Sequence, residues 1–300
     1  MTDVLIYEQL TATGCDDRKL FAEGAAIAAA CVRAFENDRT RVAVAANVDD
    51  ATLPPILRSR RIATEDIIGS DFERTLPIAP DEGLAEVVEQ LSAAGHSCWS
   101  CDSNAIRQCA DKVVTAERLR TVGVAVPETL ATSGIAPIGS VVKPRFGCGS
   151  EGVIRVRPRP QPVKEGCFCQ TYVSGRHGSV FAIRGEVRTQ LFPVVWKELS
   201  FKTTPVEGAS VVGSRIQALD QLVQTCVELI PGLRGPFGID FVLTDYGTPV
   251  VIEINPRVTS SLVGYVRASS TPVFATDCEP DWRTDYKRFT WRDAYDWSDR

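Results

Sequence analysis

The segment VIEINPRV, residues 251–258, places a carboxylate, an amide and a guanidinium within five positions after a run of β-branched residues. Side chains alternate along a strand, so Glu253 and Asn255 are predicted to share one face, with the isoleucines on the other. Hard cations such as Mg²⁺ are held by carboxylates together with phosphate oxygens and water. Arg257 follows, and a guanidinium is the usual partner of phosphate or carboxylate. Any one of these residues alone would fit a polar strand end on an exposed turn, but the three together favour a metal and anion site.

A third oxygen ligand is available from the preceding apolar run, GIDFVL. This run and residues 249–255 are predicted to form a hairpin whose turn spans Asp245 to Thr248. Asp240, Glu253 and Asn255 could then all meet across the strand pair. A carboxylate in an apolar strand is costly unless a cation or a donor offsets it, so we favour a metal ligand over a structural ion pair.

The segment VVKPRFGCGSEGV joins a strand that ends at Lys143 to a glycine-rich turn. Gly147, Gly149 and Gly152 let the backbone approach a ligand closely and offer N–H groups to phosphate oxygens, and Ser150 adds a hydroxyl. The loop lies between strands, so it is not the Walker pattern that opens a helix. Tight hairpins also use glycine, and the phosphate interpretation depends on combining this turn with the lysine and the downstream carboxylates.

Composition limits the classes of function. A chain of 300 residues predicts about two domains and a large core. The net charge is −5 and no block of five like charges occurs, which argues against a nucleic-acid partner. The basic cluster at 58–61 is interpreted as a solvated face. No apolar run reaches the roughly 18 residues that a membrane helix needs, so we expect a cytoplasmic protein without a membrane partner.

Ten cysteines raise the question of a metal or disulfide framework. The pattern CWSC at 98–101 has no second Cys-x-x-Cys, and only His96 and His177 could complete a ligand set. We therefore predict reduced, buried, metal-free thiols that behave as small apolar residues.

Hydrophobic periodicity predicts an α/β (α+β) protein. Residues 3–7 and 41–48 are expected to be buried strands and residues 20–35 and 83–95 helices, which together form an open parallel α/β domain over residues 1–104. Ligands bind beyond the carboxyl ends of strands in such sheets. Glu8 lies there, so it could face a substrate, although a solvated loop carboxylate is the alternative.

The remaining residues, 105–300, read as a helical stretch followed by mostly antiparallel strands. The helical stretch begins near Ser103 and ends at Gly123. The expected later elements are strands on both sides of the glycine turn, a strand at CFCQTYVSG, paired strands over 179–195, a helix over 213–230 and the hairpin described above.

The order Asp111-Lys112, Lys143 with its glycine loop, QTYVSG, GIDFVL and EINPR resembles the ATP-grasp superfamily over residues from about 105 to 300. The N-terminal domain resembles the one that precedes ATP-grasp modules. The resemblance implies a two-part module with a lid over about 105–175 and a metal-binding catalytic core over about 176–300. The segments YEQLTATG and EINPRVTSSLVGY are similar to the tyramine–glutamate ligase branch of methanofuran-type cofactor biosynthesis.

The resemblance also implies roles for individual residues. Lys112 and Lys143 would contact the α- and β-phosphates of ATP, and the loop from Gly147 to Gly152 would cover the β- and γ-phosphates. The backbone of Gln170, Thr171, Tyr172 and Val173 would read adenine. Asp240, Glu253 and Asn255 would hold one or two Mg²⁺ ions, or Mn²⁺, and Arg257 would act as the catalytic group that steadies the transferred phosphoryl. The family usually places an acidic residue for the ribose after YVSG, but His177 or neutral neighbours stand here, which puts that contact in doubt.

The implied activity is an ATP-dependent carboxylate–amine ligase that works through an acyl phosphate. Its substrates would be a small-molecule carboxylate and an amine, such as glutamate with tyramine or tyrosine. Glu8 and the hydroxyls of Thr259, Ser260 and Ser261 are the substrate-contact candidates. An ATP-grasp kinase and a non-catalytic nucleotide-binding protein are the alternatives, and a homodimer is compatible with the sequence.

Overall fold

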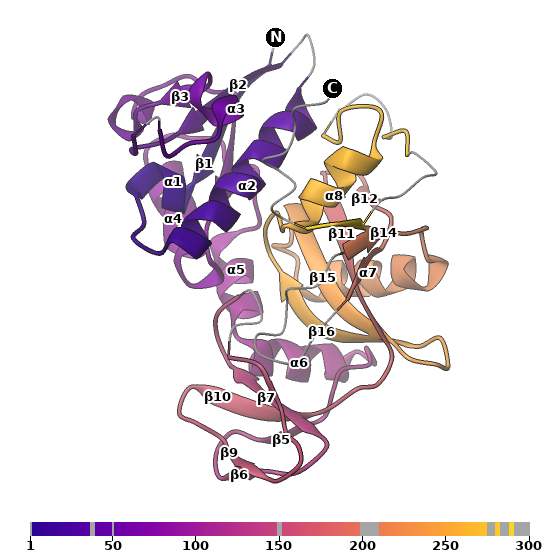
Figure 1. Cartoon of the computed structure of the whole chain (residues 1–300). Helices are drawn as coiled ribbons and strands as arrows, with labels where there is room; N and C mark the ends of the chain where they lie inside the picture. Colours follow the sequence, from indigo (N-terminus) through magenta and orange to yellow (C-terminus); the bar gives the residue numbers. More distant parts are fainter. Residues whose placement is uncertain are drawn as a thin grey trace.

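The computed structural model describes residues 2–36, 40–49, 51–148, 152–198, 210–274, 280–282 and 288–290. Figure 1 shows the N-terminal region beside the C-terminal sheet, with a small sheet below both of them. The N-terminal region contains β1 (Thr2–Glu8), α1 (Gln9–Thr13), α2 (Arg18–Phe35), β2 (Thr40–Ala45), α3 (Pro55–Arg58), β3 (Arg61–Ile62), a 3₁₀ helix (Thr64–Ile67), β4 (Arg74–Ile78) and α4 (Asp81–Ala93).

The N-terminal sheet has the strand order β3-β2-β1-β4, and every pairing in it is parallel. This confirms the predicted open parallel sheet. Val4 and Ile6 face one apolar core and Leu5 faces the other, and all three are fully buried because helices cover both faces of the sheet. The alanine-rich α2 is buried nearly all round, since it packs between this sheet and a C-terminal helix.

The predicted helical stretch from residue 103 is two helices, α5 (Ser103–Ala110) and α6 (Lys112–Thr121). Asp111 divides them because its carboxylate accepts hydrogen bonds from the backbone N–H groups of Val113 and Val114, both at 3.2 Å, and so caps α6. The guanidinium of Arg145 donates two further bonds to the same carboxylate, at 2.9 and 2.7 Å. The break therefore fixes Lys112 in the first turn of a helix.

A small antiparallel sheet follows, with the order β5-β10-β7-β8, beside a two-stranded ribbon of β6 and β9. Its apolar core is limited to Ala136, Val142, Val156 and Cys169 and their partly buried neighbours. The strands are β5 (Thr129–Ala131), β6 (Ile135–Ala136), β7 (Ser140–Pro144), β8 (Ile154–Arg155), β9 (Gln161–Pro162) and β10 (Cys167–Thr171).

The C-terminal sheet is antiparallel in the order β16-β15-β11-β13-β14-β17, with β12 paired to β11. It uses both large cores, which it shares with the N-terminal sheet. Its elements are β11 (Arg176–Arg184), β12 (Thr189–Leu191), β13 (Val195–Lys197), β14 (Ser210–Val212), α7 (Gln217–Leu229), β15 (Gly235–Leu243), β16 (Pro249–Asn255), α8 (Ser261–Ala268) and β17 (Arg288–Phe289).

The predicted hairpin of β15 and β16 is confirmed, and Thr244 N–H donates to the Thr248 carbonyl at its turn. Asp240 pairs directly with Glu253, as expected. The register shifts immediately afterwards, so Phe241 pairs with Val251 and Ile252 is the extra residue of a bulge.

Among the described helices, none combines the length and the apolar character needed to cross a bilayer.

Candidate functional site

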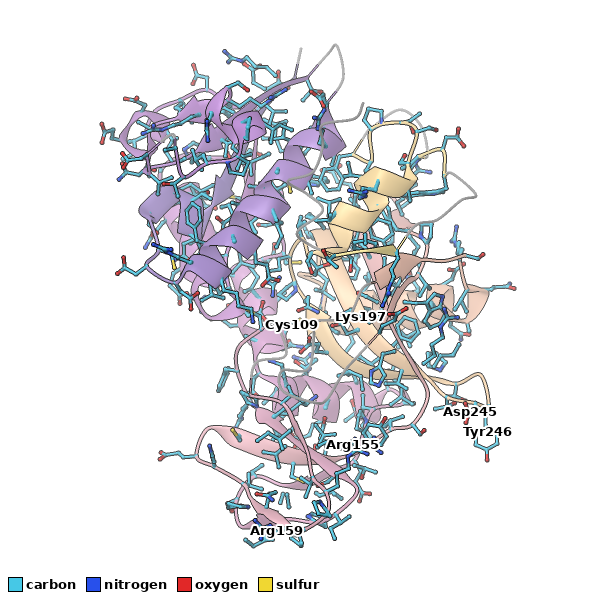
Figure 2. The ribbon with its side chains drawn as sticks, viewed as in Figure 1. Cys109, Arg155, Arg159, Lys197, Asp245 and Tyr246 are labelled. Atoms are coloured by element: carbon cyan, nitrogen blue, oxygen red, sulfur yellow. The ribbon has the colours of Figure 1, made fainter. Side chains whose placement is uncertain are left out.

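One cavity of about 620 Å³ lies where the three larger sheets meet. β1 and α2 line one end of it, β7 and β10 line another side, and β15 and β16 line the third. Figure 2 shows Lys197 in the interior, whereas Asp245 and Tyr246 project from the far tip of the β15–β16 hairpin. The strands of that hairpin therefore line the cavity, and its turn is exposed to solvent.

Asp240 and Glu253 form a carboxylate pair on this cavity. Their side chains are only 17% and 20% exposed. Burial and the neighbouring Asp240 raise the pKa of Glu253. Burial also acts to raise the pKa of Asp240, but nearby groups, chiefly the Lys197 ammonium, together outweigh it and hold that pKa below its ordinary value. The Lys197 Nζ atom lies 2.7 Å from Asp240 Oδ2.

The pair fits a cation that arrives with a phosphate-bearing ligand. Asp240 Oδ1 is buried and has no hydrogen-bond partner among the described residues, so a bound cation would satisfy it. No group of three or more His, Cys, Asp or Glu side chains suited to a metal ion occurs in the described part of the chain. Mg²⁺ does not need one, because it keeps several waters and takes one or two carboxylates plus substrate phosphates.

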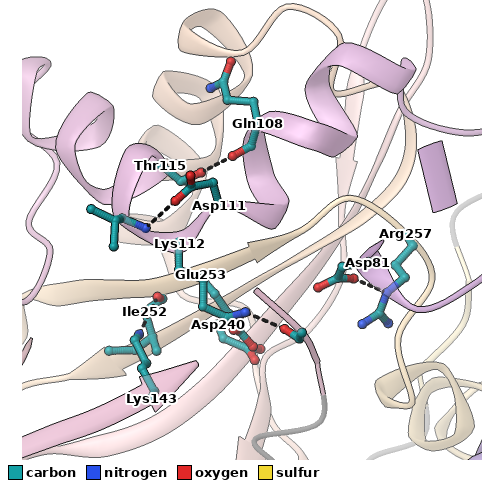
Figure 3. A network of polar contacts seen from close by, with 12 residues as sticks. Asp81, Gln108, Asp111, Lys112, Thr115, Lys143, Asp240, Ile252, Glu253 and Arg257 are labelled. Atoms are coloured by element: carbon teal, nitrogen blue, oxygen red, sulfur yellow. Dashed lines mark hydrogen bonds and ion pairs between the residues drawn. The ribbon is translucent and has the colours of Figure 1, made fainter. Parts of the chain in front are cut away.

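Two further lysines surround the carboxylates, as Figure 3 shows. Lys112 opens α6 and donates to the Gly147 carbonyl, and its Nζ lies 3.8 Å from Glu253 Oε2. Lys143 is at the end of β7, where its Nζ lies 3.4 Å from the Ile252 carbonyl oxygen and 5.2 Å from the centre of the Phe168 ring. Ile252 is the extra residue of the bulge and lines the cavity.

Burial lowers the pKa of Lys143 to about 8, against the opposing attraction of Glu253. An ammonium held in so apolar a position gains more than a surface lysine when an anion joins it. With Lys197, three cationic side chains face two carboxylates on one cavity wall. This excess of positive charge suits a polyanion.

The glycine loop forms a rim of the cavity. Gly147 has a φ of 100° and Gly152 a φ of 70°, both in the left-handed region that favours glycine. A Cβ on Gly152 would also lie 3.1 Å from the Pro144 ring. Gly149 and Ser150 lie outside the described residues. The two described glycines line the cavity, as the phosphate-loop prediction requires.

The segment from Gln170 to Val173 lines the cavity next to Lys143. Gln170 is 3% exposed, and its side chain donates to Thr129 Oγ1 at 3.4 Å. The N–H of Tyr172 is bound to the Gly139 carbonyl, and the Arg155 guanidinium stacks 3.8 Å from the centre of the Tyr172 ring. These contacts hold the segment in place beside the cavity.

Arg257 also lines the cavity. Its Nε donates to Asp81 Oδ1 at 2.6 Å, across two side chains that are 11% and 6% exposed. Burial alone would lower the pKa of Arg257, but the surrounding negative groups, chiefly the Asp81 carboxylate, together outweigh burial and raise it. Arg257 is therefore charged at neutral pH.

Glu8 reaches the opposite end of the cavity and is 1% exposed. Its two oxygens accept the N–H groups of Leu10, at 3.1 Å, and Thr11, at 2.8 Å, so it caps α1. Gly24 makes room for it, since a Cβ there would lie 2.7 Å from the carboxylate. Burial raises the pKa of Glu8 to about 7 despite those bonds. Glu8 is buried, so it is not the solvated loop carboxylate that the sequence left as an alternative.

Four of the predicted site residues that the structure describes do not line the cavity. Asn255 is buried and pairs with Gly238, and it shares one face of β16 with Glu253 because no register shift lies between them. Thr259 has a buried hydroxyl without a hydrogen-bond partner among the described residues. Ser260 and Ser261 begin α8, and Ser260 makes no capping bond with its side chain. His177, in contrast, does line the cavity, and burial lowers its pKa.

The sequence did not reveal Lys197, which lines the cavity, or Asp81, which binds the cavity residue Arg257. Lys197 is the last residue of the short strand β13, and its partner Asp240 is 43 positions away. Asp81 follows the carboxyl end of β4, a position where parallel sheets bind ligands, so that rule could have singled it out.

Comparison with known proteins agrees with this architecture. The chain is 26% identical over 216 residues to tyramine–L-glutamate ligase of Methanocaldococcus fervens, a match that covers 68% of this chain and 65% of that protein. Among solved structures, an ATP-grasp superfamily protein from Archaeoglobus fulgidus superposes with a TM-score of 0.74 at 22% identity, covering 94% of this chain and 90% of that one. D-alanine–D-alanine ligase from Bacillus anthracis, solved with ATP, gives a TM-score of 0.58 at 13% identity, covering 86% and 87%.

The sequence of residues 109–261 matches the ATP-grasp domain family. The matched span begins in α5 and ends at the start of α8. It therefore includes the three cavity lysines, the glycine loop, the carboxylate pair and Arg257. The chain belongs to the ATP-grasp domain family.

Proposed function

We propose that this protein is an ATP-dependent ligase that joins a small-molecule carboxylate to an amine. The observation that carries the proposal is the single cavity on which Lys112, Lys143, the carboxylate pair and Arg257 meet. Phosphoryl transfer needs little covalent help from a protein, so positioning and charge stabilisation by these groups would supply most of the catalysis.

In this proposal the nucleotide lies between the small sheet and the C-terminal sheet. Adenine would contact the backbone near Gln170 and Val173, and the phosphates would extend toward Lys112 and Lys143. The glycine loop, with Gly149 and Ser150, would cover the β- and γ-phosphates through its N–H groups. A D-alanine–D-alanine ligase with this fold was solved with ATP, which supports ATP as the nucleotide.

A Mg²⁺ ion held by Asp240 and Glu253 would neutralise phosphate charge while the γ-phosphoryl group is transferred. Lys197 shares Asp240, so its ammonium can remain near the transferred group when a cation takes over the carboxylate. Asn255, on the same face of β16 as Glu253, would be the third ligand of the ion.

The proposed chemistry has two steps. A carboxylate oxygen of the acid attacks the γ-phosphorus, the bond to the bridging oxygen breaks, and ADP leaves. The amine nitrogen then attacks the acyl carbon of the acyl phosphate, loses a proton, and expels phosphate to leave an amide. Arg257 would offset charge on the transferred phosphoryl and on the acyl phosphate. Closure of the glycine loop would keep water from that intermediate.

For the substrates, we propose glutamate as the acid and an aromatic amine such as tyramine or tyrosine as the acceptor. The support is the match to a relative with the name tyramine–L-glutamate ligase. Leu20 and Ile27 of α2 and Ile78 at the end of β4 give the Glu8 end of the cavity an apolar wall that suits an aromatic ring. Methanofuran-type cofactor biosynthesis would be the setting.

The deciding experiment incubates the protein with ATP, Mg²⁺, glutamate and either tyramine or tyrosine. We expect the amide and ADP in equal amounts, measured by mass spectrometry and a coupled ADP assay. ADP formed without any amide, whatever amine is offered, would instead favour a kinase with the same nucleotide site. Nucleotide binding without ADP formation would favour a non-catalytic protein.

A further inference from the structure

The ion pair between Arg257 and Asp81 connects two parts of the molecule that are 176 positions apart in sequence. Asp81 is the first residue of α4 and belongs to the N-terminal sheet layer, whereas Arg257 follows β16 of the C-terminal sheet. Figure 3 shows the two side chains meeting at the edge of the group that contains Asp240 and Glu253. The N-terminal region thus contacts the guanidinium that faces the proposed phosphoryl group.

The contact leaves most of the guanidinium available. Asp81 engages Nε, and Nη1 makes only a 3.4 Å contact to the Val258 carbonyl oxygen. No hydrogen bond of Nη2 is recorded to any of the described residues. A guanidinium held by its Nε presents its two terminal nitrogens to a ligand in a fixed orientation, which suits a planar, two-point contact to phosphate or carboxylate.

Asp81 is itself held rigidly. It follows Pro80, whose carbonyl accepts the N–H groups of Gly83 and Leu84, so the turn from β4 into α4 is fixed. A carboxylate in the first helical turn is also stabilised by the helix dipole. Asp81 therefore provides a stable anchor whose position depends on the N-terminal sheet.

Without this anchor, the charge distribution would draw Arg257 elsewhere. Glu253 attracts the guanidinium as well, although less strongly than Asp81 does. A released Arg257 side chain could turn toward the Asp240–Glu253 pair and compete there with a cation. Cys148 of the glycine loop is affected by the charges of both Asp81 and Arg257, so the loop begins against this same pair.

We propose that Asp81 is a positioning residue for the reaction, which holds Arg257 so that its terminal nitrogens face the transferred phosphoryl group. The inference depends on the proposed ligase function. In this role Asp81 would link the N-terminal sheet to catalysis, although Asp81 itself touches neither substrate. The positions of Ile78 and Pro80 on the cavity wall show that this part of the fold already borders the site.

The test compares Asp81→Asn, Arg257→Gln and the double variant in amide formation. Misplacement of a catalytic group by about 1 Å costs about 100-fold in rate, so we expect kcat to fall about 100-fold in each single variant. The double variant should be no slower than Arg257→Gln alone, because without Arg257 no guanidinium remains for Asp81 to position. The Kd for a non-hydrolysable ATP analogue should change by less than about threefold, since Asp81 does not face the nucleotide.

Glu89→Gln is the matched control, because it removes the ion pair that the same helix makes with Arg107, at 2.7 Å and away from the cavity. Asp81→Glu serves if Asp81→Asn does not fold: it keeps the charge but moves the carboxylate, and we expect about a tenfold loss of kcat. Wild-type turnover in a folded Asp81 variant, or effects that multiply in the double variant, would overturn the positioning role.

The two proposals fail in different ways. A wild-type protein that makes ADP and amide, together with a fully active Asp81→Asn variant, would overturn the positioning role alone. A wild-type protein that makes no amide from any acid and amine would overturn the ligase function and this role with it.

Discussion

Two buried carboxylates line the same cavity, Glu8 at one end and Asp240 at the other, yet their surroundings differ in kind. Both oxygens of Glu8 accept backbone N–H groups of α1. Asp240 has a lysine on one oxygen and no hydrogen-bond partner on the other among the described residues. A carboxylate whose oxygens are both engaged by backbone is well suited to support structure, while one with an open oxygen beside a lysine is ready to bind a cation.

The pKa values point the same way. Burial raises the pKa of Glu8 to about 7, because the two backbone bonds do not offset the loss of water. Lys197 holds the pKa of Asp240 low against a similar burial. A full positive charge offsets desolvation better than neutral N–H groups do. Asp240 thus remains charged when Glu8 takes up a proton.

The largest expected effect is at Asp240. Asp240→Asn keeps the shape but removes the charge that would hold Mg²⁺, so we expect amide formation to fall about 1000-fold. Asp245→Asn, at the exposed tip of the same hairpin, is the control and should keep full activity. The measurement is steady-state turnover with ATP, Mg²⁺ and both substrates. Asp240→Asn turnover within tenfold of wild type would remove this residue from the metal site.

Lys143→Ala should have the next largest effect, on nucleotide affinity. A hydrogen bond to a charged group contributes about 1.5–3 kcal/mol, so the Kd for ATP should rise by about 10-fold to 100-fold. Lys164→Ala, on an exposed turn of the same small sheet, is the control. Titration calorimetry with a non-hydrolysable analogue measures both, and an unchanged Kd in the Lys143 variant would exclude its phosphate role.

Glu8→Gln should change the pH dependence of stability. The folded pKa of Glu8 is about 7 against an ordinary value of 4.5, so between those pH values the folded state holds a proton that the unfolded state releases. The free energy of unfolding of the wild type should therefore decrease as pH rises from 4.5 to 7, by about 3 kcal/mol. The variant lacks this titration, and its advantage over wild type should grow across that window in urea unfolding. Parallel curves for the two proteins would show that Glu8 is not buried as described.

The smallest expected effect is at Thr259, which lies near the site but off the cavity. Its buried hydroxyl has no hydrogen-bond partner among the described residues, so Thr259→Val should raise the free energy of unfolding by about 1 kcal/mol. We expect its KM for the carboxylate substrate to be within about twofold of wild type. A large increase in that KM would restore the predicted substrate contact.

The local pattern of the chain determined most of the elements and part of the site. The alternation of apolar and polar residues placed Asp240 opposite Glu253, because the pairing of two adjacent strands depends only on the hairpin turn between them. The apolar runs and helix periodicity likewise predicted a parallel N-terminal sheet, and the glycines near Lys143 predicted the rim of a cavity. Each of these features depends on residues close together in sequence.

The tertiary structure decided which side chains meet across large separations. Lys197 joins Asp240 across 43 positions and Asp81 joins Arg257 across 176, and no local periodicity encodes either distance. The bulge at Ile252 comes before both Glu253 and Asn255, so these two side chains keep one face of β16, yet only Glu253 lines the cavity. Burial, which sets the pKa values of Lys143 and Glu8, comes from the packing of three sheets around one cavity, so no single segment contains it.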